Sequence, residues 1–280
     1  FSFCGFAFLF FVWFGVWVNL IYRYRWLFRI AGYVLAGVSA LLMRDDIGAE
    51  SARALGAPES RVRVTGNTKF DNLPQPPSPD ALDALRGALG LHADALVWVA
   101  GSTHEGEEEL LFPIFLRVRE RFPELRRVLA PRYVDRAARL ESLAQRHTLS
   151  VTRKSEGGGG DGVILLDTIG ELATAYALGD VVFVGGSFIE RGGQNILEPA
   201  AHGKPVLFGP HMENFADSVT LLLGRGGIQV STPAQLERVL ADLLSRPEHR
   251  EELGAMAKSL VDSQSGAAER NATAINGLLP

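Results

Sequence analysis

The chain has 280 residues, with 28 Lys and Arg against 32 Asp and Glu and a net charge of −4 at pH 7. This length allows two domains, and the mildly acidic balance, without a basic block interleaved with aromatic residues, argues against nucleic-acid binding. The single cysteine, Cys4, excludes an internal disulfide and a cysteine-based metal cluster, and the six histidines show no metal-ligand spacing. No metal site is expected.

Residues 1–22 contain no charged side chain and are rich in Phe, Trp, Val and Leu, and Arg23, Arg25 and Arg29 follow. About 20 uncharged apolar residues can span a bilayer, and arginines directly after such a segment favour a cytoplasmic location for that side. A signal peptide is disfavoured because it would carry basic residues before a shorter apolar core and a cleavage site after it. Two interpretations stay open: a membrane anchor, or the aberrant start of an incomplete chain.

The next segment has the pattern of an α/β protein. A helix is expected to end near Leu35, a strand at 38–43, a helix at 47–55 stopped by Gly56, and a strand at 61–65.

Residues 72–79, NLPQPPSP, contain four prolines and cannot form a helix or a central strand. This stretch is the predicted linker, and it separates residues 23–71 from a second domain at 80–280.

Beyond the linker, apolar runs of strand length alternate with segments of helix length. The expected strands are 96–100, 127–130, 149–153, 163–166, 181–184 and 205–208, and the expected helices are 80–89, 105–121, 134–147, 169–178, 214–223, 233–245, 247–262 and 266–279. This alternation predicts a doubly wound parallel sheet. The glycines at 157–160 precede a strand and not a helix, so they are predicted to form a flexible surface turn without a phosphate role.

Several short motifs follow the expected strands. Ser102 and Glu105 fit a capping box, although small residues at the end of a strand would also let a ligand approach the backbone. Arg132 follows Pro131 and is either a surface arginine or an anion contact. Asp167 or Thr168 is expected to cap the helix at 169–178. For each of these motifs the structural and the ligand-binding interpretations stay open.

The stretch 181–210 favours a nucleotide site. Gly185, Gly186, Gly192 and Gly193 lie between a strand and a short helix expected to open near residue 195, where bare backbone N–H groups would suit a phosphate. Asn195 and Glu198 are expected one helical turn apart, with Glu198 accepting hydrogen bonds from ribose hydroxyls. The stretch has no G-x-G-x-x-G or G-K-[ST] motif, so this pattern leaves the nucleotide open.

Seven motifs, in this order, resemble those of the 3-deoxy-D-manno-octulosonic-acid (Kdo) transferases. They are GNTKFD (66–71), GSTHEGEE (101–108), PR (131–132), DTIGEL (167–172), FVGGS (183–187), GGQNILEPAAHGKPVLFGP (192–210) and NF (214–215).

The resemblance implies a GT-B glycosyltransferase fold with two Rossmann-like domains. Residues 23–71 would be a remnant of the N-terminal acceptor domain, and residues 80–280 would form the donor domain that binds CMP-Kdo. Lys69 would stabilise the charge that develops as CMP leaves. The implied CMP contacts are Pro131, Arg132, Ile169, Gly170, Glu171, Asn195, Ile196, Leu197 and Glu198, and the further donor contacts are Ser102, Gly192 and Gly193.

The resemblance also implies a reaction: inverting transfer of Kdo from CMP-Kdo to a lipid A precursor in lipopolysaccharide synthesis, at the cytoplasmic face of the inner membrane. No cofactor and no metal are expected. The chain departs from the family in three ways: no general-base motif is recognised, and Tyr133 and Gln194 stand where histidine is common. Two alternatives therefore remain, a CMP-Kdo-binding fragment without catalysis and a GT-B enzyme that uses a UDP-sugar.

Overall fold

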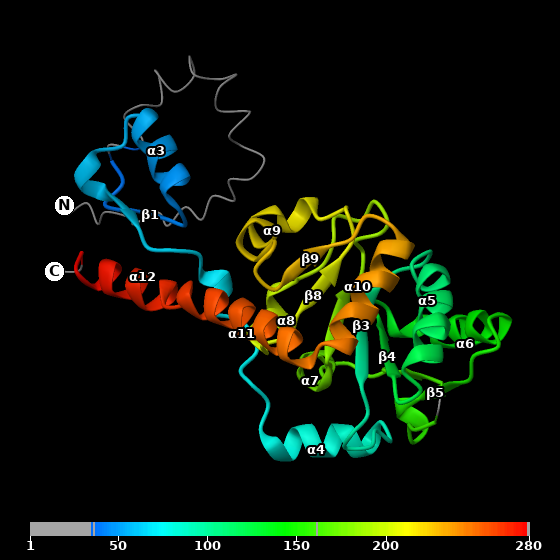
Figure 1. Ribbon diagram of the computed structural model, residues 1–280. Coiled ribbons are helices and arrows are strands. Elements are labelled where there is room, and N and C mark those ends of the chain that lie inside the picture. Colours follow the sequence, from blue (N-terminus) through cyan, green and yellow to red (C-terminus); the bar gives the residue numbers. More distant parts are fainter. Residues whose placement is uncertain (1–34, 36, 161, 279–280) are drawn as a thin grey trace. The chain divides into compact units, whose positions relative to one another are not determined.

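The computed structural model describes residues 35, 37–160 and 162–278, and the chain divides into two compact units (Figure 1). The first unit comprises residues 1–72 with 264–280, and the second comprises residues 73–263. The apolar run at 1–22 and nearly all of the helix expected to end at Leu35 lie outside the described residues. Within the described ranges, no helix combines the length and the hydropathy that a membrane crossing requires.

The first unit contains a small βαβ arrangement. Strands β1 (Leu41–Met43) and β2 (Val62–Val64) pair in parallel, and helix α3 (Asp46–Ala54) connects them. The Asp45 side chain accepts from the backbone N–H of Gly48 at 2.7 Å and caps α3. The strand, helix and strand expected here from the sequence are therefore present; both strands are shorter than predicted, and the helix has the predicted length but begins one residue earlier.

Helix α12 (Ala267–Asn276) also belongs to the first unit, whereas the predicted donor domain extended to residue 280. The Asp71 carboxylate accepts from the backbone N–H groups of Gly266 and Ala268, at the start of α12. Arg270 donates to the carbonyl oxygen of Thr65 at 2.8 Å. The end of the 66–71 motif thus holds the C-terminal helix within this unit.

The second unit is built on a seven-stranded parallel sheet in the order β5-β6-β4-β3-β7-β8-β9. Its strands are β3 (Val97–Thr103), β4 (Arg126–Pro131), β5 (Val151–Arg153), β6 (Val163–Leu165), β7 (Val181–Val184), β8 (Val206–Phe208) and β9 (Gly227–Gln229). The predicted doubly wound parallel sheet is confirmed. Strand β9 was not predicted, because three residues beginning with glycine carry no recognisable strand pattern.

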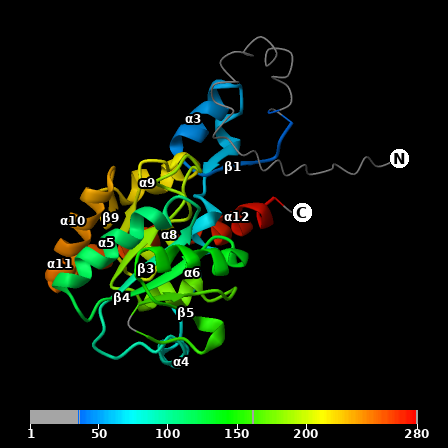
Figure 2. The same cartoon turned by 90° about the vertical axis from the view of Figure 1, so that its right-hand side faces the viewer.

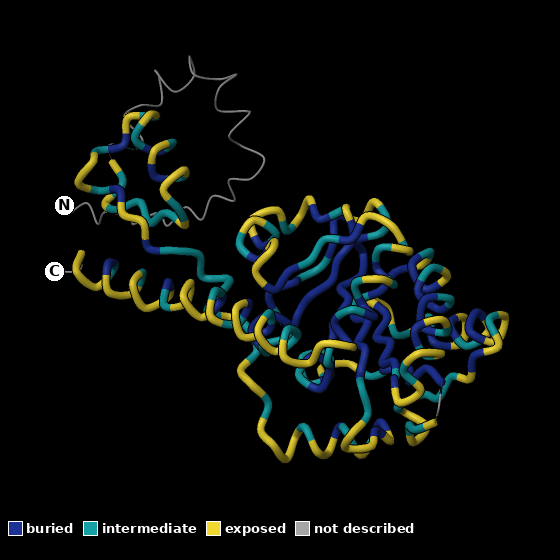
Figure 3. Tube along the Cα trace, viewed as in Figure 1, coloured by how far each residue is buried: buried dark blue, intermediate teal, exposed yellow. Residues whose placement is uncertain are grey.

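Helices cover both faces of this sheet, and their outer surfaces are exposed while the central strands are buried (Figures 2 and 3). They are α4 (Pro79–Ala88), α5 (Glu108–Arg121), α6 (Ala137–Arg146), α7 (Leu172–Leu178), α8 (Leu197–Ala201), α9 (Ala216–Leu222), α10 (Pro233–Ser245) and α11 (Pro247–Ser263).

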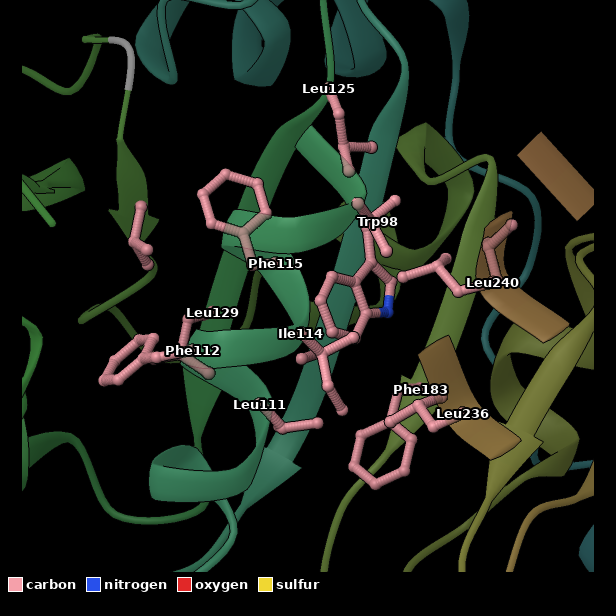
Figure 4. Packing of buried hydrophobic residues seen from close by; sticks show 14 of the residues in the cluster. Trp98, Leu111, Phe112, Ile114, Phe115, Leu125, Leu129, Phe183, Leu236 and Leu240 are labelled. Carbon is pink, nitrogen blue, oxygen red and sulfur yellow. The ribbon is translucent and has the colours of Figure 1, made fainter. Parts of the chain in front are cut away.

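The largest apolar cluster joins the sheet to α5, α6 and α10. Figure 4 shows Trp98 of β3 surrounded by side chains from α5 and α10, among them Ile114 and Leu240. These side chains are fully buried, and each such Leu or Ile contributes roughly 1.5–3 kcal/mol of hydrophobic stabilisation. The cluster anchors β3 and β7 side by side in the middle of the sheet.

The glycines at 157–160 pack against the end of α4. All four have positive φ, and a Cβ on Gly158 would lie 1.9 Å from the carbonyl oxygen of Ala88. The backbone N–H of Gly159 donates to Leu89 at 3.2 Å. Glycine is therefore needed here because two backbone segments approach closely. The predicted flexible surface turn did not foresee this packing.

Candidate functional site

The candidate site lies at the carboxyl edge of the second unit's sheet, where the chain order reverses. Strand β3 is flanked by β4 on one side and β7 on the other, so the connection from β3 to β4 and the connection from β7 to β8 run in opposite directions along the sheet. In open α/β sheets this reversal point is where ligands bind. The predicted donor contacts of this unit lie in the last residues of β3 and β4, in the loops after β4, β6 and β7, and at the start of α8.

Strand β3 ends in a bulge at Ser102. Its φ is 55°, and the register with β4 shifts between Gly101 and Thr103. A left-handed conformation is unusual for serine, and such bulges occur next to active sites. The predicted capping box is wrong: Ser102 lies in the strand, Glu105 pairs with Arg139, and α5 begins only at Glu108.

Tyr176 lies directly beneath this bulge. A Cβ on Gly101 would lie 2.3 Å from the Tyr176 hydroxyl oxygen, so only glycine fits there. Burial, reinforced by the charge of Glu198, raises the pKa of Tyr176, and a hydrogen bond with Ser102 opposes that rise. The phenol is thus neutral and connects the end of β3 to the region around Glu198.

The loop after β7 is held by Glu107, a fully buried carboxylate. It accepts from the backbone N–H groups of Gly186 at 2.7 Å and of Ser187 and Phe188 at 3.0 Å each. The N–H groups expected to be bare for a phosphate are therefore occupied at these three residues, and that part of the prediction is wrong. The role of Glu107 could not be predicted from the sequence, because its partners lie about 80 positions away along the chain.

The loop after β4 is held by Glu108. This fully buried carboxylate pairs with two nitrogens of Arg136, at 2.8 and 3.1 Å.

Arg127 is also fully buried, with its guanidinium 4.9 Å from the centre of the Trp98 ring. Burial lowers the pKa of Arg127 to about 9, and the charge of Glu108 opposes that shift.

Arg132, the first residue beyond β4, is exposed and has a fixed backbone. Its N–H donates to the carbonyl oxygen of Thr103 at 2.9 Å, and its guanidinium lies 5.7 Å from the centre of the Tyr133 ring. The rings of Tyr133 and His104 meet edge to face at 6.0 Å. Within the described ranges no carboxylate forms an ion pair with Arg132, so its charge is available to an anion.

The residues after β6 form a loop, and the helix predicted from residue 169 begins only at Leu172. Ile169 is 86% exposed at the tip of this loop. Glu171 accepts from Lys154 at 2.9 Å and from the hydroxyl of Thr168. Burial raises the pKa of Glu171, but these two hydrogen bonds and the charge of Lys154 outweigh burial, so the net pKa is lowered.

The predicted helix caps before α7 are also wrong. Asp167 accepts instead from the backbone N–H of Ser155 at 3.0 Å, and Thr168 bonds the Glu171 side chain. Both contacts fix the loop that carries Ile169 and Gly170.

Asn195 and Glu198 lie together at the start of α8. The Asn195 amide donates to the Glu198 carboxylate at 3.1 Å, and its oxygen accepts from the N–H of Leu197 at 3.1 Å. Burial raises the pKa of Glu198, and the bond from Asn195 opposes that rise. The side chains of Ile196 and Leu197 are buried in the core, which leaves only their backbone for a ligand.

Gly192 and Gly193 have structural partners of their own. A Cβ on Gly192 would lie 2.2 Å from the Asn214 amide nitrogen, and one on Gly193 would lie 2.4 Å from the sulfur of Met212. The close approach of residues 212–214 therefore explains why glycine is needed at both positions. A contact of Gly192 or Gly193 with the donor stays a prediction.

Lys69 belongs to the first unit, in a 3₁₀ turn at Thr68–Phe70. The Asn67 side chain accepts from its backbone N–H at 3.1 Å, and its ammonium lies 5.1 Å from the centre of the Phe70 ring. In neither unit do the described His, Cys, Asp and Glu residues form a group of three suited to a metal ion.

Comparison with known proteins supports the family suggested by these motifs. Residues 19–72 match the family described as 3-deoxy-D-manno-octulosonic-acid transferase (kdotransferase). The transferase of Haemophilus influenzae is 32% identical over 238 residues, which cover 83% of this chain and 55% of that protein. The C-terminal CMP-Kdo binding domain of WaaA from Acinetobacter baumannii aligns with a TM-score of 0.60 at 29% identity, over 65% of this chain and 96% of that domain.

The chain belongs to the Kdo transferase family. It spans about half the length of the H. influenzae relative and 60% of the Bordetella pertussis transferase, to which it is 32% identical. A GT-B glycosyltransferase-like fold is confirmed. HepE from Anabaena, in complex with UDP and glucose, shares that fold with a TM-score of 0.55 at 16% identity.

Proposed function

We propose that the second unit binds CMP-Kdo and that the chain transfers Kdo to a lipid A precursor. The observation that carries the proposal is the gathering of the second unit's family motifs at one edge of its sheet, in a unit similar to a CMP-Kdo binding domain. Three features of this edge suit a nucleotide: the exposed guanidinium of Arg132, the exposed loop tip at Ile169 and the half-buried carboxylate of Glu198.

Each polar group has a proposed role. The Arg132 guanidinium binds the CMP phosphate, because a planar guanidinium suits a phosphate and this one has a fixed backbone. The Glu198 carboxylate, aligned by Asn195, accepts from the ribose hydroxyls. Ile169, Gly170 and Glu171 contact the cytidine.

The chemistry proposed is an inverting displacement. A hydroxyl of the lipid A precursor attacks the anomeric carbon of Kdo and loses its proton, while the bond from that carbon to the phosphate oxygen breaks. The electron pair of that bond leaves with CMP. Lys69 and Arg132 stabilise the charge that develops on the leaving phosphate, so we propose that neither metal nor cofactor is required.

The acceptor in this proposal is an amphipathic lipid. We therefore propose that the chain acts at a membrane surface, on the cytoplasmic face of the inner membrane.

The direct test is a transfer assay with CMP-Kdo and a lipid A precursor, in which the product gains the mass of Kdo. We expect transfer to persist in EDTA. Lys69→Ala should lower kcat at least about 100-fold, a typical loss when a group that stabilises transition-state charge is removed. Lys258→Ala, at a partly exposed lysine of α11, is the control and should retain activity. A chain that binds CMP and never transfers Kdo would be a donor-binding module, and the enzyme proposal would fail.

A further inference from the structure

Two consecutive buried carboxylates, Glu107 and Glu108, lie at the start of α5 and contact different loops. Both are 0% exposed. A buried carboxylate destabilises the fold unless it is paired or hydrogen-bonded, so each of these two must have partners that compensate its charge. Glu107 contacts the loop after β7, and Glu108 contacts Arg136 in the loop after β4. One dipeptide thus reaches the loops beyond both neighbours of β3.

Glu107 has four backbone partners. One carboxylate oxygen accepts from His104 at 2.9 Å and Gly186 at 2.7 Å, and the other accepts from Ser187 and Phe188 at 3.0 Å each. Four N–H groups compensate the charge and use the acceptor sites of both oxygens. The backbone at 186–188 is therefore fixed without any ligand.

Glu108 acts on the other side of β3. Its two bonds to the Arg136 guanidinium are a bidentate pair, the geometry with the strongest directional preference. Arg136 ends the short turn Val134–Arg136, and Arg132 at the start of the same loop is bonded to Thr103. The backbone that carries Arg132 is therefore fixed at both ends.

We propose that Glu107 and Glu108 are positioning residues, which hold the backbone at 186–188 and the loop at 132–136 in their nucleotide-binding conformation before the nucleotide arrives. The inference rests on the proposed function, since it takes these loops as the CMP site. Neither carboxylate faces the ligand, because both are buried and fully bonded to the protein. A loop that is ordered in advance does not lose conformational entropy on binding, which strengthens affinity.

The first test uses the unchanged chain. Amide hydrogen exchange at Gly186, Ser187 and Phe188 should be slow without CMP and should change little when CMP is added. Fast exchange without CMP, followed by protection once CMP is present, would show that the ligand orders the loop and would overturn the inference.

The second test compares three adjacent glutamates. In Glu107→Gln, an NH₂ group replaces one oxygen and faces two N–H donors, so we expect fast exchange at 186–188 and CMP binding weakened at least about tenfold. Glu108→Gln should weaken CMP binding and speed exchange at 132–136. Glu109→Gln removes the same charge from the exposed side of that turn and should bind CMP like the unchanged chain.

The outcomes separate this inference from the proposed function. CMP binding by the unchanged chain and equally tight binding by Glu107→Gln would overturn the positioning role alone. If the unchanged chain does not bind CMP, the proposed function fails first, and the nucleotide role of the two carboxylates fails with it.

Discussion

Gly101 illustrates, at the scale of single residues, how the end of β3 is constrained. The Tyr176 ring fills the space that any side chain at this position would need. We expect Gly101→Ala to lower the free energy of unfolding by about 1–3 kcal/mol, because overpacking forces the ring or the strand to move. Urea denaturation measures this, with Gly87→Ala in α4 as the control.

Gly87 has no atom within 4 Å of an added Cβ, so alanine there should raise stability by up to about 1 kcal/mol through helix propensity. Equal stability of Gly101→Ala and the unchanged chain would contradict the described position of Tyr176.

The raised pKa of Glu198 makes the stability of the chain depend on pH, which gives a second test at the scale of single residues. Burial raises its pKa above the ordinary value of 4.5, so the native chain holds this proton more tightly than the unfolded chain does. The stability that Glu198 contributes is then fully present below pH 4.5 and is lost as the pH rises through the raised pKa. Glu198→Gln removes this dependence, so its stability relative to the unchanged chain should increase from pH 4.5 toward neutral pH.

Denaturant midpoints over that pH range measure the trend. Glu190→Gln, exposed in the same loop, is the control for removal of one carboxylate charge. A stability difference for Glu198→Gln that does not vary with pH would contradict the raised pKa.

At the scale of elements, the contact between Asp71 and α12 is the clearest dependence on one side chain. Gly266 precedes α12 and has no side chain with which to cap the helix, so Asp71 supplies the acceptors from a distant part of the chain. Asp71→Ala should cost about 1 kcal/mol, as for the loss of other N-terminal caps, and should speed amide exchange in the first turn of α12. Glu269→Gln, exposed in that turn, is the matched control. Unchanged exchange in Asp71→Ala would contradict the cap.

Elements were predictable from the sequence where their pattern is strong. Strand β7, four apolar residues between a helix and a glycine loop, has the predicted bounds, and so does α10. The start of α5 was misplaced by three residues, because the Ser102 and Glu105 pattern fits a capping box while the strand continues through Ser102. Local pattern does not reveal that a bulge extends the strand.

At the scale of the whole molecule, the order of the motifs indicated the family, and the alternation of strands and helices indicated the parallel sheet. The partners of the site residues could not be predicted in the same way. Glu107 meets the glycine loop only because β3 and β7 are neighbours in the sheet, and the helix beginning at residue 267 belongs with the first 72 residues through contacts nearly 200 positions apart. Such contacts depend on topology, which a single sequence specifies only indirectly.

Calorimetric titration of the full chain with CMP and with UDP tests whether the second unit binds CMP, as we propose. We expect CMP to bind and to raise the thermal stability of the chain, because it binds only the native state, and UDP to do neither. Arg132→Ala should weaken CMP binding about tenfold through loss of a charged hydrogen bond, and Arg146→Ala, at the C-terminal end of α6, should not. Binding of UDP without binding of CMP would contradict the proposal that the second unit is a CMP site.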